Sequence, residues 1–270
     1  MASLKASLIG KVPGKLASLL PVSFDQIGSI ALFNDFPKEL KKYEKLIGNQ
    51  LIKLNKNITT VAIKSKKFSG KYRLQKVRTI AGKKTKETIH KENGLTFKLN
   101  IEKTYFSPRT GSERLRIASK IKPKESVLVM FSGIGPFSVL AAKKAKEVYA
   151  VEINPSAHKY ALENIKLNKA KNLKSYKGDV STILPKLKKK FNRIIMPLPT
   201  DSESYLSLAL KYLKTKGIIH FYDFSREEIF PEYSIKKIKK HCKRFKVLSK
   251  VKCGNYSPGT CRVCIDFQPL

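Results

Sequence analysis

The chain has 270 residues, and its 56 lysines and arginines exceed its 20 aspartates and glutamates to give a net charge of +36. Hydrophobic residues make up 41% of the chain, which indicates a globular protein, and no apolar run approaches the roughly 20 residues of a membrane-spanning helix. The N-terminal stretch is interrupted by Lys5, Lys11, Pro13, Gly14 and Lys15. We therefore expect no signal peptide and a cytoplasmic protein.

The excess of positive charge predicts a polyanionic partner, because a field of this size attracts and holds nucleic acid. The alternative is a lysine-rich surface common to all proteins of the source. Two of the four cysteines, Cys261 and Cys264, lie in the strand-like segment TCRVCIDF, where residues three apart point to opposite faces. No second CxxC motif or suitable histidine pair completes a zinc site. We expect structural thiols and no metal.

The first part of the chain predicts a small α+β domain over residues 21–104. Short apolar segments separated by Gly, Asn and Lys clusters (SIALF, TTVAIK, RTIAG and LTFKLN) are typical of strands, and FPKELKKYEKLIGNQL has a helical pattern. Residues 1–20 are expected to form a short appendage, and residues 105–120 a connecting helix.

From residue 121 to 270 strand-like and helical segments alternate. The predicted strands are SVLVMF, EVYAVEIN, LKSYKGD, RIIMPLP, GIIHFYDF and TCRVCIDF, and the predicted helices include SAHKYALENIKLNK, SESYLSLALKYLK and SIKKIKKHCKRFK. This alternation predicts an α/β domain with a doubly wound, mostly parallel sheet, whose ligands bind at the carboxyl ends of the strands.

Three successive strands of this domain end in residues suited to a nucleoside cofactor. The first is followed by a turn containing Gly133 and Gly135, where backbone can approach a ligand. Glu152 ends the next strand, 19 residues after Gly133, and can accept hydrogen bonds from ribose hydroxyls. A nicotinamide site would place a third glycine at Ser138. Because residues 178–180 (GDV) add an acid on the third strand, the pattern resembles the S-adenosylmethionine site of Rossmann-fold methyltransferases; the alternative is a set of ordinary tight turns.

Longer stretches make the resemblance more specific. The segments YFSPRTGSER, MFSGIGPFS, VYAVEINPSAHKYALENIKLNK, GDV and RIIMPLP together resemble the archaeal tRNA (guanine-37, N1) methyltransferase family, and GKYRLQKVRTIAG and TIHKENG resemble its small domain. The resemblance covers residues 20–270 in the same order. It implies that S-adenosylmethionine is bound by Tyr105, Arg114, Phe131, Gly133, Gly135, Glu152, Ile153, Asn154, Asp179, Val180 and Pro197.

The resemblance also implies catalytic roles for Glu113 and Arg73. Guanine N1 carries a proton at neutral pH, so a general base must remove it as the methyl group arrives, and we assign this role to Glu113. A guanidinium at Arg73 would stabilise the charge that develops toward O6, with Arg78 as the rival if the alignment slips. The alternative for Glu113 is an acid favoured by a helix N-terminus. Arg109, Arg73 and Tyr105 are the expected RNA contacts.

Two residues depart from the pattern of that family. Val129 stands where the family usually has an aspartate before the glycine turn, so cofactor contacts there would rely on backbone. Pro197 replaces the asparagine of an Asn-Leu-Pro stretch, and is expected beside both cofactor and target base. A proline here resembles the archaeal subgroup that also methylates carbon 7 of 4-demethylwyosine in wyosine biosynthesis. We therefore expect a widened substrate range.

The expected partner is the anticodon stem-loop of tRNA, in particular tRNA-Phe, bound by a monomer through its lysine-rich surface. For the basic helix SIKKIKKHCKRFK, phosphate contact and a solvated outer face remain equally open. His90 is expected to be structural and His220 to lie in the core or at a strand end. Two other functions stay open: the related aminocarboxypropyl transferase, whose relatives favour a histidine at Pro136, and an inert RNA-binding protein with this fold.

Overall fold

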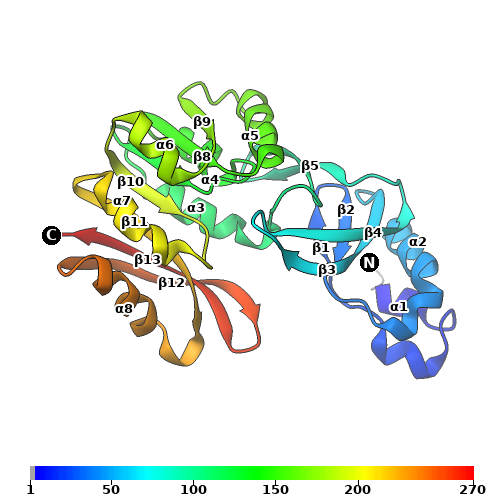
Figure 1. Cartoon of the computed structure of the whole chain (residues 1–270). Coiled ribbons are helices and arrows are strands. Elements are labelled where there is room, and N and C mark those ends of the chain that lie inside the picture. Colours follow the sequence, from blue (N-terminus) through cyan, green and yellow to red (C-terminus); the bar gives the residue numbers. More distant parts are fainter. Residues whose placement is uncertain (1–3) are drawn as a thin grey trace. The chain divides into compact units, whose positions relative to one another are not determined.

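The computed structural model describes residues 4–270, without the side chains of residues 66–69. The chain divides into two compact units, Met1–Pro108 and Arg109–Leu270 (Figure 1). The division falls inside the segment 105–120 that the sequence marked as a connection.

The first unit combines a small mixed sheet with one longer helix. Strands β1 to β4 pair in that order, with β2 and β3 parallel and the other neighbours antiparallel, while β5 and β6 form a separate hairpin. The N-terminal segment, expected as an appendage, contributes Leu8, Val12 and Leu20 to the core of this unit. The elements are α1 (Leu4–Leu8), η1 (Gly14–Leu19), β1 (Asp25–Ile27), β2 (Ile30–Phe33), η2 (Lys38–Tyr43), α2 (Glu44–Leu54), β3 (Thr60–Ser69), β4 (Leu74–Gly82), β5 (Glu87–Glu92) and β6 (Leu95–Asn100).

The second unit is built on a seven-stranded sheet in the order β12-β13-β11-β10-β7-β8-β9. Strands β11, β10, β7, β8 and β9 are parallel, and β13 runs antiparallel to both of its neighbours. The strand order reverses between β7 and β10, which is where a doubly wound sheet binds its ligand. The predicted α/β fold is confirmed.

The helices and strands of the second unit follow the predicted alternation. They are η3 (Pro108–Thr110) at the boundary, α3 (Gly111–Ser119), β7 (Ser126–Met130), α4 (Pro136–Ala142), β8 (Glu147–Glu152), α5 (Pro155–Leu167), β9 (Leu173–Lys177), α6 (Val180–Leu187), β10 (Phe191–Met196), η4 (Ser202–Tyr205), α7 (Leu206–Lys211), β11 (Leu213–Arg226), η5 (Glu227–Ile229), α8 (Glu232–His241), β12 (Phe245–Ser257) and β13 (Thr260–Pro269).

The two faces of this sheet are covered differently. One face carries Leu128, Met130, Phe221 and Phe267, which pack in a single apolar cluster with residues of α6, α7 and α8. Side chains alternate along a strand, so residues such as Val129, Tyr222 and Asp266 point to the other face. Within residues 4–270, no helix is long and apolar enough to cross a membrane.

Strand β12 was not expected. The sequence predicted a helix continuing to Lys246, but α8 ends at His241 and β12 begins at Phe245. From Phe245 onward half-buried and exposed residues alternate with period two, which is a strand pattern, and it directly follows a lysine-rich helical pattern that hides the change of period. β12 and β13 therefore form the orange-to-red hairpin at one edge of the sheet (Figure 1).

Candidate active site

The turn between β7 and α4 has the shape expected of a ligand-binding turn. Phe131, Gly133 and Gly135 all adopt positive φ, of 55°, 57° and 92°, and only Phe131 among them has a side chain that makes this conformation unfavourable. The turn is held by hydrogen bonds from Ser132 N to Val151 O and from Gly135 N to Ser132 O, each 3.0 Å. The Ser132 hydroxyl is buried and has no hydrogen-bond partner among the described residues. An unpaired buried hydroxyl is uncommon, and here it marks a turn whose polar groups are not all satisfied by the protein.

Glu152 organises this turn. One carboxylate oxygen accepts a hydrogen bond from Gly133 N at 2.6 Å, and the other accepts one from Asn154 N at 2.7 Å. Burial raises the pKa of Glu152, and the backbone hydrogen bonds from Asn154 and Gly133 oppose that rise. Val129 lies fully buried in β7, so the acid that positions the glycine turn in this chain comes from the neighbouring strand.

The other predicted acids and amides at the strand ends cap helices. The side chain of Asn154 accepts from Ser156 N and Ala157 N at the start of α5, and Asp179 accepts from Ser181 N at the start of α6. Such capping occupies one oxygen of Asp179 at 2.8 Å and leaves its other oxygen available. The side chain of Val180 is buried in the core, and Ile153 is half-buried.

An aromatic pair lies at the same edge of the sheet. The rings of Phe131 and Tyr205 meet edge to face with centroids 4.9 Å apart. Burial raises the pKa of Tyr205, and the charges of Asp179 and Asp201 add to the rise, which places its hydroxyl near Asp179. Tyr205 had not been singled out in the sequence. Together Phe131, Tyr205 and Asp179 offer an apolar surface beside an acceptor, which suits a planar base with an exocyclic amine.

Pro197 follows the last residue of β10. In the parallel register Ile195 lies beside Val129, so Pro197 lies level with Phe131 of the turn. The carbonyl oxygens of Met196 and Leu198 are both within hydrogen-bonding distance of the Ser202 hydroxyl, at 3.2 and 2.5 Å. Within the described chain the carbonyl of Pro197 accepts no hydrogen bond, so it remains available to a ligand.

Glu113 is buried in the first turn of α3 and is tightly held. Arg116 donates to both carboxylate oxygens, at 2.6 and 2.7 Å, and the Tyr222 hydroxyl donates to Oε1 at 2.6 Å. Tyr222 comes from β11, 109 residues away in the sequence. A carboxylate fixed by three donors keeps one orientation, and one lone pair of Oε2 remains for a further proton donor.

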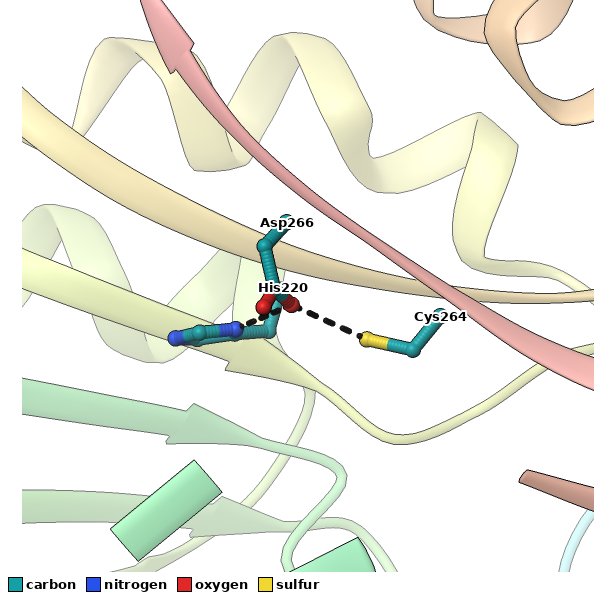
Figure 2. Close-up of side chains that lie close together, drawn as sticks. All are labelled: His220, Cys264 and Asp266. Carbon is teal, nitrogen blue, oxygen red and sulfur yellow. Dashed lines mark hydrogen bonds and ion pairs between the residues drawn. The ribbon is translucent and has the colours of Figure 1, made fainter. Parts of the chain in front are cut away.

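Arg116 also contacts a buried polar cluster on β11 and β13. Arg116 donates to Asp266, as does Lys120 at 2.6 Å, and His220 Nδ1 lies 2.6 Å from the same carboxylate. Figure 2 shows Asp266 between His220 and Cys264, whose thiol lies 3.3 Å from Oδ1. His220 is confirmed as a core residue.

Charge argues against a cation at this cluster. His220, Cys264 and Asp266 could bring three ligand atoms within 4.8 Å of one another. Two positively charged side chains already pair with Asp266, and Arg193 occupies the other imidazole nitrogen at 2.7 Å. Because a guanidinium can only donate, Nε2 of His220 accepts from Arg193 and the ring donates through Nδ1 to Asp266; burial lowers the pKa of His220 in the same sense. These side chains satisfy one another as an electrostatic network.

Arg114 links α3 to the first turn of α4. The residue is buried, donates to the Thr110 hydroxyl at 2.5 Å and lies over the ring of Phe137, 6.0 Å from its centroid. Phe137, in the first turn of α4, meets the Tyr222 ring edge to face at 5.7 Å. One set of contacts therefore runs from the turn after β7 to the carboxylate of Glu113.

In the first unit the two candidate arginines, Arg73 and Arg78, have different surroundings. Arg78 makes a bidentate ion pair with Glu44, with both N–O distances 2.7 Å. Arg73 sits at positive φ in the turn before β4, and among the described residues no side chain pairs with its guanidinium. Tyr105 and, in the second unit, Arg109 are exposed. His90 accepts from Gly28 N at 3.1 Å and packs on Phe106, which are structural contacts.

The free cysteines behave as structural thiols. All four are free, and Cys261 and Cys264 bond to groups on opposite faces, Glu227 and Asp266. The residues that sequence reasoning missed are Tyr205, Arg116, Tyr222 and Asp266. Only Arg116 had a local signal, since a basic residue three positions after an acid on a helix pairs with it.

Comparison with known proteins identifies relatives over nearly the whole chain. Residues 88–249 match the TRM5/TYW2 methyltransferase domain, and residues 4–85 match the TYW2 N-terminal domain. The tRNA (guanine(37)-N(1))-methyltransferase Trm5b of Pyrococcus abyssi is 41% identical over 96% of this chain and 78% of its own length, and its crystal structure superposes with a TM-score of 0.87, covering 95% of this chain and 78% of that one.

Two further relatives carry different activities. The tRNA (guanine(37)-N(1))/4-demethylwyosine(37)-methyltransferase Taw22 of Nanoarchaeum equitans is 30% identical over 77% of this chain and 85% of its own length. A tRNA(Phe) (4-demethylwyosine(37)-C(7)) aminocarboxypropyltransferase of Methanocaldococcus jannaschii is 33% identical over 92% of this chain and 98% of its own length.

Proposed function

The chain belongs to the TRM5/TYW2 methyltransferase family, and on that premise we propose that it transfers a methyl group from S-adenosylmethionine to N1 of guanosine 37 in tRNA. The observation that carries the proposal is the set of contacts from the glycine turn through Phe137 and Tyr222 to the buried carboxylate of Glu113. The glycine turn and the candidate base are thereby linked by side-chain contacts within the second unit.

The residues at the strand ends fit the cofactor. Glu152 keeps lone pairs for ribose hydroxyls after it has accepted two backbone hydrogen bonds, and Phe131 with Tyr205 offers an apolar surface for adenine beside the free oxygen of Asp179. When bound, S-adenosylmethionine supplies an electrophilic methyl group on a sulfonium. The protein's part is to orient that group and to exclude water from it.

Glu113 is the proposed base. Its remaining lone pair on Oε2 takes the N1 proton of guanine, while Arg116 and Tyr222 fix the carboxylate in a single orientation. Arg73, which has no charge partner among the described residues, is available to stabilise charge at O6 of guanine. Arg109, Arg73 and Tyr105 are the proposed RNA contacts, with the cofactor residues as assigned from the resemblance.

The test is transfer of labelled methyl from S-adenosylmethionine to tRNA transcripts that carry guanosine or adenosine at position 37. We expect label only on the guanosine transcript, recovered as 1-methylguanosine by nucleoside mass. Cofactor binding without transfer to either transcript would favour an inert RNA-binding protein. Transfer to both would contradict the assignment of the target base.

A second activity, methylation of carbon 7 of 4-demethylwyosine, is favoured by Pro197. Its ring offers no side-chain amide to orient a nitrogen nucleophile, which a carbon nucleophile does not need. Taw22, a relative with both activities in its name, supports this. Transcripts of tRNA-Phe carrying 4-demethylwyosine would become methylated, and Pro197→Asn would reduce that reaction more than guanosine methylation.

The competing product is an aminocarboxypropyl adduct, since a transferase of that kind matches this chain over 98% of its own length. The two reactions use the same cofactor and target carbon, so the mass of the modified nucleoside distinguishes them.

We also propose that the protein binds the anticodon stem-loop of tRNA-Phe, that it is a monomer and that it is cytoplasmic.

A further inference from the structure

The strands β11, β13 and β12 extend beyond the carboxyl end of the rest of the sheet. β10 ends at Met196, which lies beside Phe221 of β11, yet β11 continues to Arg226 in unbroken register with β13. At about 3.3 Å per residue, these five additional residues extend the ribbon by about 16 Å. The ribbon thus projects from the edge at which the candidate active site lies, and its hairpin tip is the orange-to-red turn of Figure 1.

An aromatic pair with one exposed ring lies on this ribbon. The rings of Phe224 and Tyr256 are 4.0 Å apart between centroids and tilted by 30°, and Tyr256 is 60% exposed. The guanidinium of Arg262 lies over the Phe224 ring, 5.9 Å from its centroid. Phe224 therefore backs the tyrosine ring and is itself covered by Arg262, while Tyr256 keeps a large exposed surface.

The charge around the pair suits an anion. Arg226, two residues along β11 from Phe224, points to the same face and is exposed, and no described side chain pairs with it. The neighbouring acid, Glu227, is turned to Lys252, with their charged atoms 3.7 Å apart, and to Cys261. The face of β11 that carries Phe224 thus also carries the exposed guanidinium of Arg226, and aromatic rings beside positive charge are the groups that bind single-stranded nucleic acid.

The strand face that carries Phe224 also carries Tyr222, which contacts the candidate base Glu113. Tyr222, two residues before Phe224 on β11, donates its hydroxyl hydrogen bond to Glu113. Burial raises the pKa of the Cys253 thiol, the charge of Glu113 adds to that rise and Arg262 opposes it, so both charges reach this thiol. Phe224 therefore lies two residues, or about 7 Å, along β11 from the tyrosine that holds the Glu113 carboxylate.

We propose that Tyr256 is a stacking platform for an unpaired nucleotide next to the one that is methylated, with Phe224 and Arg262 supporting the ring and Arg226 contacting a phosphate. This inference rests on the proposed function, because it takes the RNA to be the substrate of the Glu113 site. The ligand is an RNA base with its phosphate, stacked face to face on the tyrosine; the recognition is tolerant of base identity because every base has a π-face.

The first experiment compares binding of tRNA-Phe transcript at fixed salt by the full chain and its variants. Tyr256→Ala should weaken binding about five- to one-hundred-fold, the range for loss of one aromatic stacking partner, and Tyr256→Phe should restore it. Tyr256→Leu, apolar but without a π-face, should behave like the alanine variant. The matched control is Tyr233→Ala on α8, another exposed tyrosine of this unit, which should bind as wild type. Equal binding by wild type and Tyr256→Ala would overturn the proposal.

The second experiment removes the base instead of the ring. Two transcripts are made, with an abasic site immediately 5′ or immediately 3′ of position 37. One of the two should bind the wild-type protein more weakly than the intact transcript does. On that transcript Tyr256→Ala should cause no further loss of affinity. If Tyr256→Ala weakens binding of both abasic transcripts as much as it weakens binding of the intact transcript, the tyrosine does not stack on either base. Methyl transfer by the wild-type protein to saturating unmodified transcript is measured alongside. If the wild-type protein transfers no methyl group, the proposed function is wrong. If it transfers methyl normally but the effect of Tyr256→Ala is the same with and without either flanking base, only the stacking proposal is wrong.

Discussion

Replacing Asp266 by asparagine tests the buried network beside the candidate base. Its carboxylate oxygens are contacted by Arg116 twice, by Lys120, by His220 and by the Cys264 thiol. Asparagine keeps one acceptor oxygen and turns an NH₂ group toward donors. Loss of one partner from a buried ion pair costs about 3–5 kcal/mol, which agrees with about two charge-assisted hydrogen bonds at 1.5–3 kcal/mol each. For a unit of this size that is a fall in Tm of about 6–20 °C.

The pH dependence of this loss has a definite sign. Burial alone would raise the pKa of Asp266, but the interaction with His220 and the hydrogen bonds from Arg116 and Lys120 outweigh it and hold the pKa well below its usual range. The stabilisation is therefore complete above the unfolded-state pKa of about 3.9 and declines as the pH falls through and below that value. The asparagine side chain of the variant cannot titrate, so the gap between wild type and Asp266→Asn should narrow below about pH 4.

Urea unfolding of the full chain, followed by circular dichroism from pH 3 to 8, measures this gap. Glu228→Gln, at an exposed acid of the same unit, is the matched control and should stay within about 0.5 kcal/mol of wild type. A gap under about 1 kcal/mol at pH 7, or one that is the same at pH 3 and pH 7, would refute the reasoning.

Four further outcomes are expected from the site. Glu113→Gln should lower kcat about 10²- to 10⁴-fold in methyl transfer while leaving the cofactor Kd, measured by calorimetry, unchanged; equal kcat would remove it as the base. Glu152→Gln loses an acceptor for Gly133 N–H and should weaken cofactor binding about 10- to 100-fold in the same calorimetric assay. Arg73→Met should lower kcat about 100-fold or more, whereas Arg78→Met, which breaks only an exposed ion pair with Glu44, should cost about 0–1 kcal/mol of stability and no activity; the reverse order would exchange their roles. Dialysis against a chelator should leave methyl transfer unchanged, since cationic side chains already occupy the cluster around Asp266; loss of activity restored by Zn²⁺ would contradict this.

The fold was predictable because its signals are local. Alternating apolar segments specified six of the seven strands of the larger sheet, and the glycines at positive φ gave the place of the ligand turn. β12 escaped because its period-two pattern is carried by half-buried residues and is preceded by lysines. The capping roles of Asn154 and Asp179 also follow from short-range geometry, although the sequence suggested ligands at both.

The sequence by itself determined six strands of the larger sheet, the glycine turn, the spacing of Glu152 from it and the position of a candidate base at the start of a helix. The tertiary structure alone decided which charges meet. Arg116 reaches Asp266 over 150 residues, and Glu113 reaches Tyr222 over 109. With 56 basic side chains and 20 acidic ones, almost any acid has a basic neighbour in sequence, so local pattern cannot select its partner. The selection is made by the pairing of β11 with β13, which buries Asp266 beside His220 and leaves Arg116 of α3 and Lys120, just after that helix, as the groups that neutralise it.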